Sequence, residues 1–449
     1  MKREWFVAVT CAAVSLASAA PASGQDRDQY RDVTVIGSDP VRQVTLGQAV
    51  RIARALNPEL RVAETNVDVA EFNRLDAWGN FLPTFDAGFG YTNSSTGRLD
   101  QTGQAIVATS YFFQLTGRYN LFEGFRKFTQ LNSAQLDLSA QQARFRRDEF
   151  SLLLAVKQAY YDALAVRDLV AVEGDRVERQ ELQLEFVTQQ LELGRSTRSD
   201  VLRSQVDLNN AKIALLNAEN DSRAATFQLG RTIGLDGRVE PSPEETLAAD
   251  PLQISRDDAY RIGLQTAPSV VSAEATAEAA ASRVSTAKSA YLPNLAFTGG
   301  WAWANTEFPP QSRSWSVALT GSYPLFNGFS RETNVYRAQA VADAAVSEQR
   351  GAELQLIVDL DAAYNTIQVA TASIELAEQS VELSREDLRV SSERYRLGLA
   401  TILDLQTAQI AVSQAEVDLI RRRFEYQIGV ASLESLLGRR LQELEATPQ

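Results

Sequence analysis

The stretch Leu121-Phe-Glu-Gly-Phe125 returns as Leu325-Phe-Asn-Gly-Phe329, 204 residues later. The same offset relates many other residues, and it holds without a gap from residue 121 to residue 234. The matched positions include Ala134 and Ala338, Gln135 and Gln339, Tyr160 and Tyr364, Gly194 and Gly398, Asp200 and Asp404, and Gly234 and Gly438. A constant offset over that length indicates a tandem duplication, so we interpret the chain as one object built from two halves.

In each copy the hydrophobic pattern changes its period at this motif. Before the motif, apolar and polar residues alternate, which predicts two strands per copy, at about 85–91, 111–121, 295–303 and 315–325. Each strand is about ten residues long, enough to cross a bilayer at a tilt, and aromatic residues lie near both ends. A soluble sandwich sheet with one buried face would show the same alternation. The aromatic ends, together with a secretion signal described below, favour the membrane.

Four strands are too few to close a barrel. The smallest bacterial barrels have about eight strands, and an open sheet edge is not tolerated in lipid. No stretch beyond the N-terminus offers the ~20 consecutive apolar residues of a transmembrane helix, so we expect any membrane insertion to use strands. Several copies must therefore share one barrel, in which two copies would supply eight strands and three would supply twelve.

After the motif the pattern takes the period of a helix. The sequence contains no proline between Pro83 and Pro241, or between Pro324 and Pro448, which fits long helices because proline breaks them. The longest would extend about 100 Å. The predicted helices are Arg126–Leu191, Thr197–Thr232, Arg331–Arg396 and Thr401–Leu437. A spacing of seven in the second helix of each pair indicates coiled coils, at Val201, Leu208, Leu215, Leu405, Val412 and Leu419.

Composition excludes several classes of function. The net charge of −13 disfavours a nucleic-acid partner, because phosphate backbones need a basic surface. The chain has no histidine, and its only cysteine is Cys11. It therefore lacks the usual general base, the soft metal ligands and the thiol nucleophile. We expect no enzyme activity, no cofactor and no metal site.

The N-terminus has the features of a secretory signal. Lys2 and Arg3 precede an apolar run, and Ala17-Ser-Ala19 or Ala20-Pro-Ala22 fits a cleavage site. Each repeat is expected to contain a helix, two transmembrane strands and a long helical hairpin. The expected divisions are a signal peptide at 1–24, a flexible N-terminal segment at 25–44, repeat 1 at 45–234, a surface linker at 235–252, repeat 2 at 253–438 and a tail at 439–449.

The order and spacing of these features resemble the TolC family of outer-membrane factors over nearly the whole mature chain. The resemblance rests on the duplication, on Leu-Pro before each first strand, on the Leu-Phe-x-Gly-Phe motifs and on Leu-Gly-x-x-Thr turns followed by Asp. It implies a homotrimer with a twelve-stranded membrane β-barrel and an α-helical coiled-coil barrel that forms a tunnel through the periplasm.

The resemblance also implies partners and a function. A periplasmic adaptor and an inner-membrane transporter would dock below the tunnel, and the barrel would lie in outer-membrane lipid. The chain would then be the outer-membrane exit duct of a tripartite efflux pump or of a type I secretion system. A periplasmic coiled-coil protein without pore activity is the alternative, and the sequence does not identify the cargo.

The two glycine turns are similar to the family's adaptor-facing tips. Glycine permits the left-handed conformation that ends one helix, and a hydroxyl residue can begin the next. A plain helix hairpin would need the same residues. The expected tip residues are Leu193, Gly194 and Thr197 in repeat 1 and Leu397, Gly398 and Thr401 in repeat 2.

The resemblance further implies a gate at the tunnel entrance. Asp404, Asp200 and Tyr395 match positions of that gate, and threefold symmetry would turn Asp404 into a ring of three carboxylates. The family's closed-state latch joins a Tyr and an Arg to an Asp, but here Ala400 occupies the Arg position and Thr407 replaces a second entrance acid. The residues themselves leave another interpretation open for Asp200, because the helix dipole favours an acid in a first turn.

Overall fold

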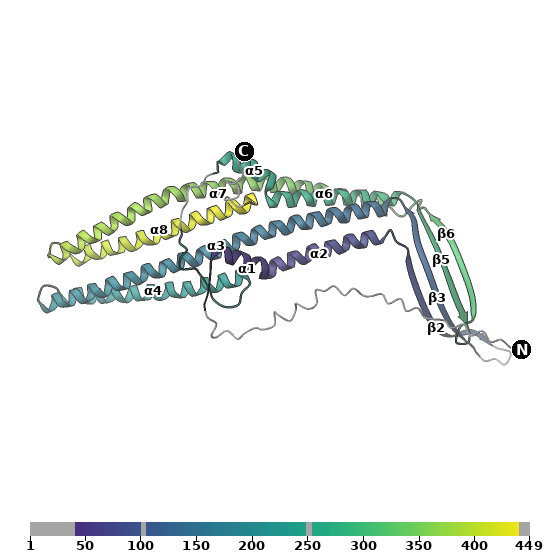
Figure 1. Ribbon diagram of the computed structural model, residues 1–449, viewed down its shortest axis with the longest axis horizontal. Coiled ribbons are helices and arrows are strands. Elements are labelled where there is room, and N and C mark those ends of the chain that lie inside the picture. The colour runs from purple at the N-terminus through teal and green to yellow at the C-terminus, as the bar shows by residue number, and fades with distance from the viewer. Residues whose placement is uncertain (1–40, 100–104, 248–253, 440–449) are drawn as a thin grey trace. The chain divides into compact units, whose positions relative to one another are not determined.

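The computed structural model describes residues 41–99, 105–247 and 254–439 (Figure 1), so the predicted signal peptide lies outside the described residues. Within these ranges the same order of elements occurs twice: two short helices, two strands and a pair of long helices. The elements are β1 (Arg42–Val44), α1 (Leu46–Leu56), α2 (Pro58–Gly79), β2 (Thr84–Leu99), β3 (Ala105–Glu123), α3 (Arg126–Glu192), α4 (Arg198–Ile233), β4 (Val239–Pro241), α5 (Arg256–Thr266), α6 (Pro268–Lys288), η2 (Ser289–Tyr291), β5 (Asn294–Asn305), β6 (Ser312–Ser322), α7 (Ser330–Arg396) and α8 (Ile402–Leu437).

The four long helices begin and end within one residue of their predicted bounds. The repeated motif sets the starts of α3 and α7. In it, Phe125 and Phe329 both take φ 64° immediately before the helix. A left-handed residue at that point turns the chain sharply, so the strand ends and the helix begins. The sequence thus fixes the position of the turn twice, at equivalent places.

The four longer strands form one antiparallel sheet in the order β2-β3-β5-β6 (Figure 1). β3 of the first repeat pairs with β5 of the second, with Leu115 opposite Trp301 and Gly117 opposite Gly299. β2 and β6 are the two edges of this sheet. The strands of repeat 1 have 16 and 19 residues, longer than the ten expected, whereas β5 and β6 have 12 and 11. β2 continues through the mostly polar residues 92–99, where alternation gives no signal, and β3 begins at Ala105, six residues before the predicted strand.

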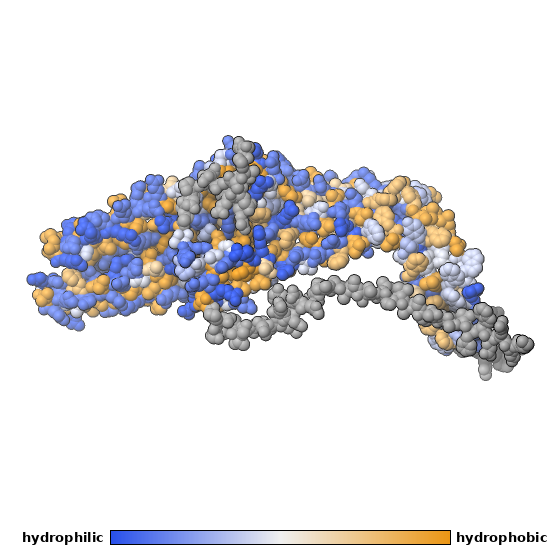
Figure 2. Space-filling view, viewed as in Figure 1, coloured by the Kyte–Doolittle hydropathy of each residue, from blue (hydrophilic) through white to orange (hydrophobic). Residues whose placement is uncertain are grey.

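The two faces of the sheet differ in chemistry. The registers place Phe85, Leu115 and Trp301 on one face, and Asp86, Thr116 and Ser316 on the other. Figure 2 shows apolar surface over the sheet and over the helix ends next to it. In the part of the chain that the structure describes, no helix is both long enough and apolar enough to span a bilayer.

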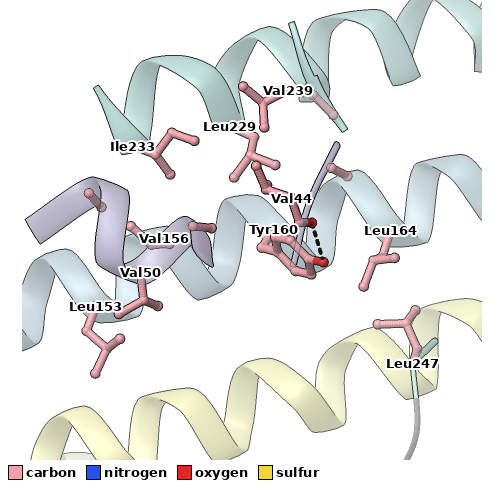
Figure 3. Close-up of a cluster of buried hydrophobic side chains, with 14 residues drawn as sticks. Val44, Val50, Leu153, Val156, Tyr160, Leu164, Leu229, Ile233, Val239 and Leu247 are labelled. Atoms are coloured by element: carbon pink, nitrogen blue, oxygen red, sulfur yellow. Dashed lines mark hydrogen bonds between the residues drawn. The ribbon is translucent and has the colours of Figure 1, made fainter. Parts of the chain in front are cut away.

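A buried core joins the start of the chain to the end of repeat 1 (Figure 3). The Tyr160 hydroxyl donates a hydrogen bond of 3.0 Å to the carbonyl of Val44, and Val44, Tyr160 and Val239 are almost fully buried. β1 and β4 pair in parallel beside this core. A second core cluster occupies the equivalent place in repeat 2, between α5, α7 and α8.

This core corrects two expectations. The segment 25–44 was expected to be flexible, but its described end forms β1. The region 235–252 was expected to be a surface linker, but it forms β4 and buries both Val239 and Leu247. Both segments are short and weakly patterned, and their burial depends on partners about 200 residues away in the sequence.

The helices of each pair pack along the predicted seven-residue seams. Leu208, Leu405 and Val412 are buried, and the other three predicted positions are half-buried. Ser204, Ala211 and Ala218 are buried at the intermediate positions and complete the seam of α4. Alternate spacings of three and four are the seam of a coiled coil, so the predicted class of packing is confirmed.

Candidate functional site: helix tips and open edges

The turn at the end of each long hairpin follows from its glycine. Gly194 and Gly398 take φ 72° and 73°, which closes α3 and α7. The following backbone N–H groups, of Arg195 and Leu399, each donate a hydrogen bond of 2.8 Å to a carbonyl five residues earlier. This is the Schellman ending, which satisfies carbonyls that the helix leaves unpaired. Leu193 and Leu397 lie exposed beside these glycines.

The next helix begins with a capping box at both tips. Thr197 donates from its backbone N–H (3.0 Å) and its hydroxyl (2.8 Å) to the carboxylate of Asp200, and the Asp200 N–H donates to the Thr197 hydroxyl. Thr401 and Asp404 make the same three hydrogen bonds, at 2.8, 2.8 and 3.3 Å. Both acids therefore have a role in starting a helix, which explains the spacing from Thr to Asp in each tip.

These hydrogen bonds shift the pKa of both carboxyl groups downward. For Asp200, burial favours the neutral form, but hydrogen bonds from Thr197 and Ser196 and the charge of Arg203 outweigh it and lower the pKa. For Asp404, the backbone and side-chain hydrogen bonds of Thr401 lower the pKa, and the charge of Arg394 adds to this. Each acid is thus ionised at neutral pH in the single chain.

The structure brings Tyr395 and Asp200 together across the two hairpins. The ring of Tyr395, near the end of α7, lies edge-on to Phe186 of α3 with a centroid distance of 6.1 Å. Burial raises the pKa of Tyr395, and the nearby Asp200 carboxylate raises it further, whereas a hydrogen bond with Ser196 lowers it. Tyr395, Ser196 and Asp200 therefore form one cluster between the tips of repeats 1 and 2.

The other gate positions lie apart from this cluster. Asp404 is exposed and directs its carboxylate at Thr401. Thr407 donates its hydroxyl to the carbonyl of Leu403 within its own helix. Ala400 has no polar side-chain atom and so cannot supply the cation of the latch.

Sequence reasoning missed a set of polar contacts between the two hairpins. Gln180 of α3 donates a hydrogen bond of 2.9 Å to Gln409 of α8, and both side chains are buried. Lys157 of α3 forms an ion pair with Glu434 of α8, with only 15% and 8% of these side chains exposed. A polar residue at a seam position is the signal that could have found them, because burial there requires a partner.

Among the described residues, nothing covers the two lateral edges of the chain. On one side, β6 is exposed along its length, and α7 presents apolar residues at intervals of seven. On the other side, β2, α2 and α4 also expose apolar side chains. The α7 residues are Val369, Leu376, Leu383 and Val390, and Leu397 continues the spacing just past the end of α7; those of α2 and α4 include Val62, Val69, Phe72, Leu202, Val206, Ile213 and Leu216.

Two comparisons with known proteins agree with this geometry. The family model described as "Outer membrane efflux protein" matches residues 49–235 and 260–439. The chain belongs to the outer membrane efflux protein family. It is similar to the outer membrane protein TolC of Escherichia coli K12, with 23% identity over 411 residues, covering 88% of this chain and 82% of TolC.

Two further similarities concern members with different names. The alkaline protease secretion protein AprF of Pseudomonas aeruginosa is 24% identical over 377 residues, covering 82% of this chain and 76% of AprF. Among solved structures, the open state of the MtrE outer membrane channel of Neisseria gonorrhoeae matches with a TM-score of 0.75 at 19% identity, over 90% of this chain and 94% of MtrE.

Family membership confirms the predicted fold class. It also makes the protein an outer-membrane export channel with a periplasmic tunnel, and so decides against the alternative of a coiled-coil protein without a pore. The gate and the adaptor-facing tips stay predictions, because the comparisons name no residues.

Proposed function

We propose that three copies of the chain pool their sheets into a twelve-stranded barrel and form the exit duct of a tripartite efflux pump or a type I secretion system. The observation that carries this proposal is the pair of unpaired edges. Because the two edges differ, the same contact can be repeated around a ring, as in any heterologous interface that closes. Closure also removes the open sheet edge, which lipid does not tolerate.

The repeats themselves supply the contacts of such a ring. Within the chain, β3 pairs with β5, and α3 packs against α6 and α8. The counterparts of these elements in the other repeat are β6 and α7 on one edge, and β2, α2 and α4 on the other. The next copy would therefore repeat across the interface the packing that already joins repeat 1 to repeat 2.

One pair of equivalent glycines, Gly124 and Gly328, identifies a contact expected at the interface between copies. A side chain at Gly124 would meet Leu292 and the carbonyl of Ser289 at 2.5 Å, whereas nothing lies within 4 Å of the same position at Gly328. Pro83 and Pro293 begin the first strands of the two repeats, so Leu82 corresponds to Leu292. Leu82 is half exposed in the single chain. In the proposed ring, Leu82 of the next copy fills the space beside Gly328.

The helix tips would then surround the tunnel entrance. Three Asp404 carboxylates would share one ring, and repulsion among them would raise the pKa that is low in the single chain. Such a ring favours cations at the entrance. The cluster of Tyr395 and Asp200 would hold the two hairpins of one copy together in the closed state, in a latch without the family's Arg.

The exposed tips would receive the periplasmic adaptor, and the inner-membrane transporter would lie below it. Leu193 and Leu397 give each tip an apolar contact beside a glycine turn of fixed shape. The chain contains no P-loop pattern, so energy for transport would come from the transporter. We propose no enzyme activity, since membership of a channel family supports a passive duct.

We further propose that a signal peptide at 1–24 is removed and that the mature protein carries the two repeats, 45–234 and 253–438. The relatives' names point to two kinds of system, because one is named for secretion of a protease, whereas the family is named for efflux. The neighbouring genes would identify the cargo class, because the pump or secretion ATPase defines it.

Single-channel recording in planar bilayers tests the duct. The purified protein is expected to conduct as a trimer, and Asp404→Asn is expected to reduce its preference for cations while Thr407→Ala, one helical turn away, leaves it unchanged. A trimer that never conducts, including as Asp404→Ala, would contradict the duct. Conduction with equal cation selectivity in both variants would support the duct and would contradict a role of Asp404 in the gate.

A further inference from the structure

A groove of about 510 Å³ lies between α2 and α3, next to the sheet. Its walls are apolar at the end nearer the strands, where Trp78 and Phe128 lie five residues or fewer from the turn at each strand. Both side chains are more than half exposed, as is Leu75. The other end of the groove is polar and is formed by Arg74, Asn132 and Gln135. The groove is therefore amphipathic along its length.

The cation at the polar end is only weakly engaged. Arg74 reaches Glu71 and Gln135 at 3.4 Å each, near the upper limit for a hydrogen bond, and its side chain is 40% exposed. By contrast, Arg283 on α6 makes a 2.6 Å ion pair with Asp137. The Arg74 guanidinium thus has donors available for an anion, and guanidinium groups bind phosphate oxygens well.

The apolar end of the groove continues onto the membrane face of the sheet. Phe128 packs edge-on against Phe81 at 5.1 Å, and Phe81 also lines a cavity of about 560 Å³ over the strands. Gly117 and Gly299, which face each other across β3 and β5, line that cavity together with aromatic rings, and Arg118 is its one charged lining residue. The contact between Phe81 and Phe128 therefore joins the hollow on the sheet to the apolar end of the groove.

The residues that line this groove are not repeated at the equivalent positions of repeat 2. By the offset that relates Pro58 to Pro268, Arg74 and Trp78 correspond to Val284 and Lys288. By the offset of the repeated motif, Phe128 corresponds to Glu332. These positions in repeat 2 therefore carry neither the two aromatic rings nor the arginine, although the backbone is duplicated.

We propose that this groove and the sheet hollow together bind one anionic phospholipid of the periplasm-facing leaflet, with an acyl chain over Gly117 and Gly299 and the phosphate on Arg74. Two observations select this occupant: the apolar end is continuous with the membrane face, and the only cation lining the groove lies at its far end. A soluble phosphate compound would leave the apolar walls bare. The inference rests on the outer-membrane placement and is independent of the gate.

Native mass spectrometry of the detergent-purified, delipidated protein tests this proposal. With dioleoyl phosphatidylglycerol as the probe, one lipid per chain is expected to bind. Arg74→Gln is expected to weaken binding about tenfold, the loss of a charge-assisted hydrogen bond, and Arg74→Lys to restore part of it. Arg61→Gln is the matched control, because Arg61 lies on the same helix and pairs with Glu64 away from the groove.

Three results would overturn the proposal. Equal affinity of the Arg74→Gln and Arg61→Gln proteins for the lipid would show that Arg74 does not contact the phosphate. Displacement of the lipid by glycerol 3-phosphate would show that the acyl path contributes nothing. Loss of the oligomer with unchanged lipid per chain in Trp78→Ala would show that a neighbouring copy occupies the groove. Bound lipid is counted per chain, so the measurement does not depend on trimer formation. A protein that binds lipid without forming trimers would contradict the proposed duct but would support the lipid site.

Discussion

The two strand-to-helix turns have the same sequence pattern and the same backbone, but different surroundings. Gly124 and Gly328 have φ 61° and 66°, and each precedes a left-handed Phe. Gly124 is enclosed by Ser289 and Leu292, which lie just before the first strand of repeat 2, whereas Gly328 faces open space. The difference shows that local sequence sets the turn, while the packing around it depends on which element lies beside it. Ser289 of η2 and Leu292 lie against Gly124, and no described atom takes the same place beside Gly328.

The largest expected difference in stability is between substitutions at positions 157 and 361, which are equivalent in the two repeats. Lys157→Met is expected to lower the free energy of unfolding by about 3–5 kcal/mol, because it removes one partner of the buried ion pair with Glu434. Asp361→Asn is expected to cost at most about 1 kcal/mol, because its 3.1 Å pair with Arg256 is well exposed. Denaturant unfolding followed by helical circular dichroism measures both, and equal costs would contradict the difference.

The turn glycines give the next effect. Gly124→Ala is expected to cost about 3 kcal/mol, from left-handed strain and from the clash with Ser289. Gly328→Ala has only the strain in the single chain, about 1–2 kcal/mol. In the ring, however, it would also press on the next copy, so the folded monomer should persist while the trimer is lost on native gels. A stable Gly328→Ala trimer would count against the proposed interface.

The caps should behave alike in both repeats. Thr197→Ala and Thr401→Ala are each expected to cost about 1 kcal/mol, because each removes the hydroxyl of a capping box. Hydrogen exchange of the first turns of α4 and α8 measures this locally. A loss of stability at only one tip would contradict the prediction that the two capping boxes contribute equally.

The smallest effect is the pH dependence of the tips. The pKa values of Asp200 and Asp404 lie below the ordinary 3.8, so each carboxylate stabilises the folded state above pH 3.8 and loses this effect as the pH falls through the lowered pKa. In the single chain, protection of the first turns of α4 and α8 should therefore fall in acid, and Asp→Asn at either position should abolish the fall at that tip. Protection that rises in acid in the single chain would contradict the lowered pKa values.

Sequence alone predicted the features that depend on local physics. Proline-free spans and seven-residue seams predicted the long helices, and glycine with Thr-x-x-Asp predicted the tip turns. It failed for β1 and β4, whose burial depends on Tyr160 and on a partner strand far along the chain. It predicted a gate at Asp200 and Asp404 from resemblance, but it did not predict that both cap a helix. The hydrogen bonds that make both acids helix caps are visible only in three dimensions, and the gate stays a prediction.

The proposed ring is tested most directly by a disulfide between copies. The pair Leu115 and Trp301 within the chain corresponds to Leu319 of one copy and Tyr91 of the next. With Cys11 in the predicted signal peptide, a Leu319→Cys, Tyr91→Cys double variant contains just these two thiols once processed. Oxidation is expected to link the chains up to a covalent trimer, since paired strands bring such residues within disulfide range. The matched control, Leu319→Cys with Phe85→Cys, is displaced by about 20 Å and should stay monomeric on denaturing gels. Monomers in both variants, or equal linkage in both, would contradict the ring.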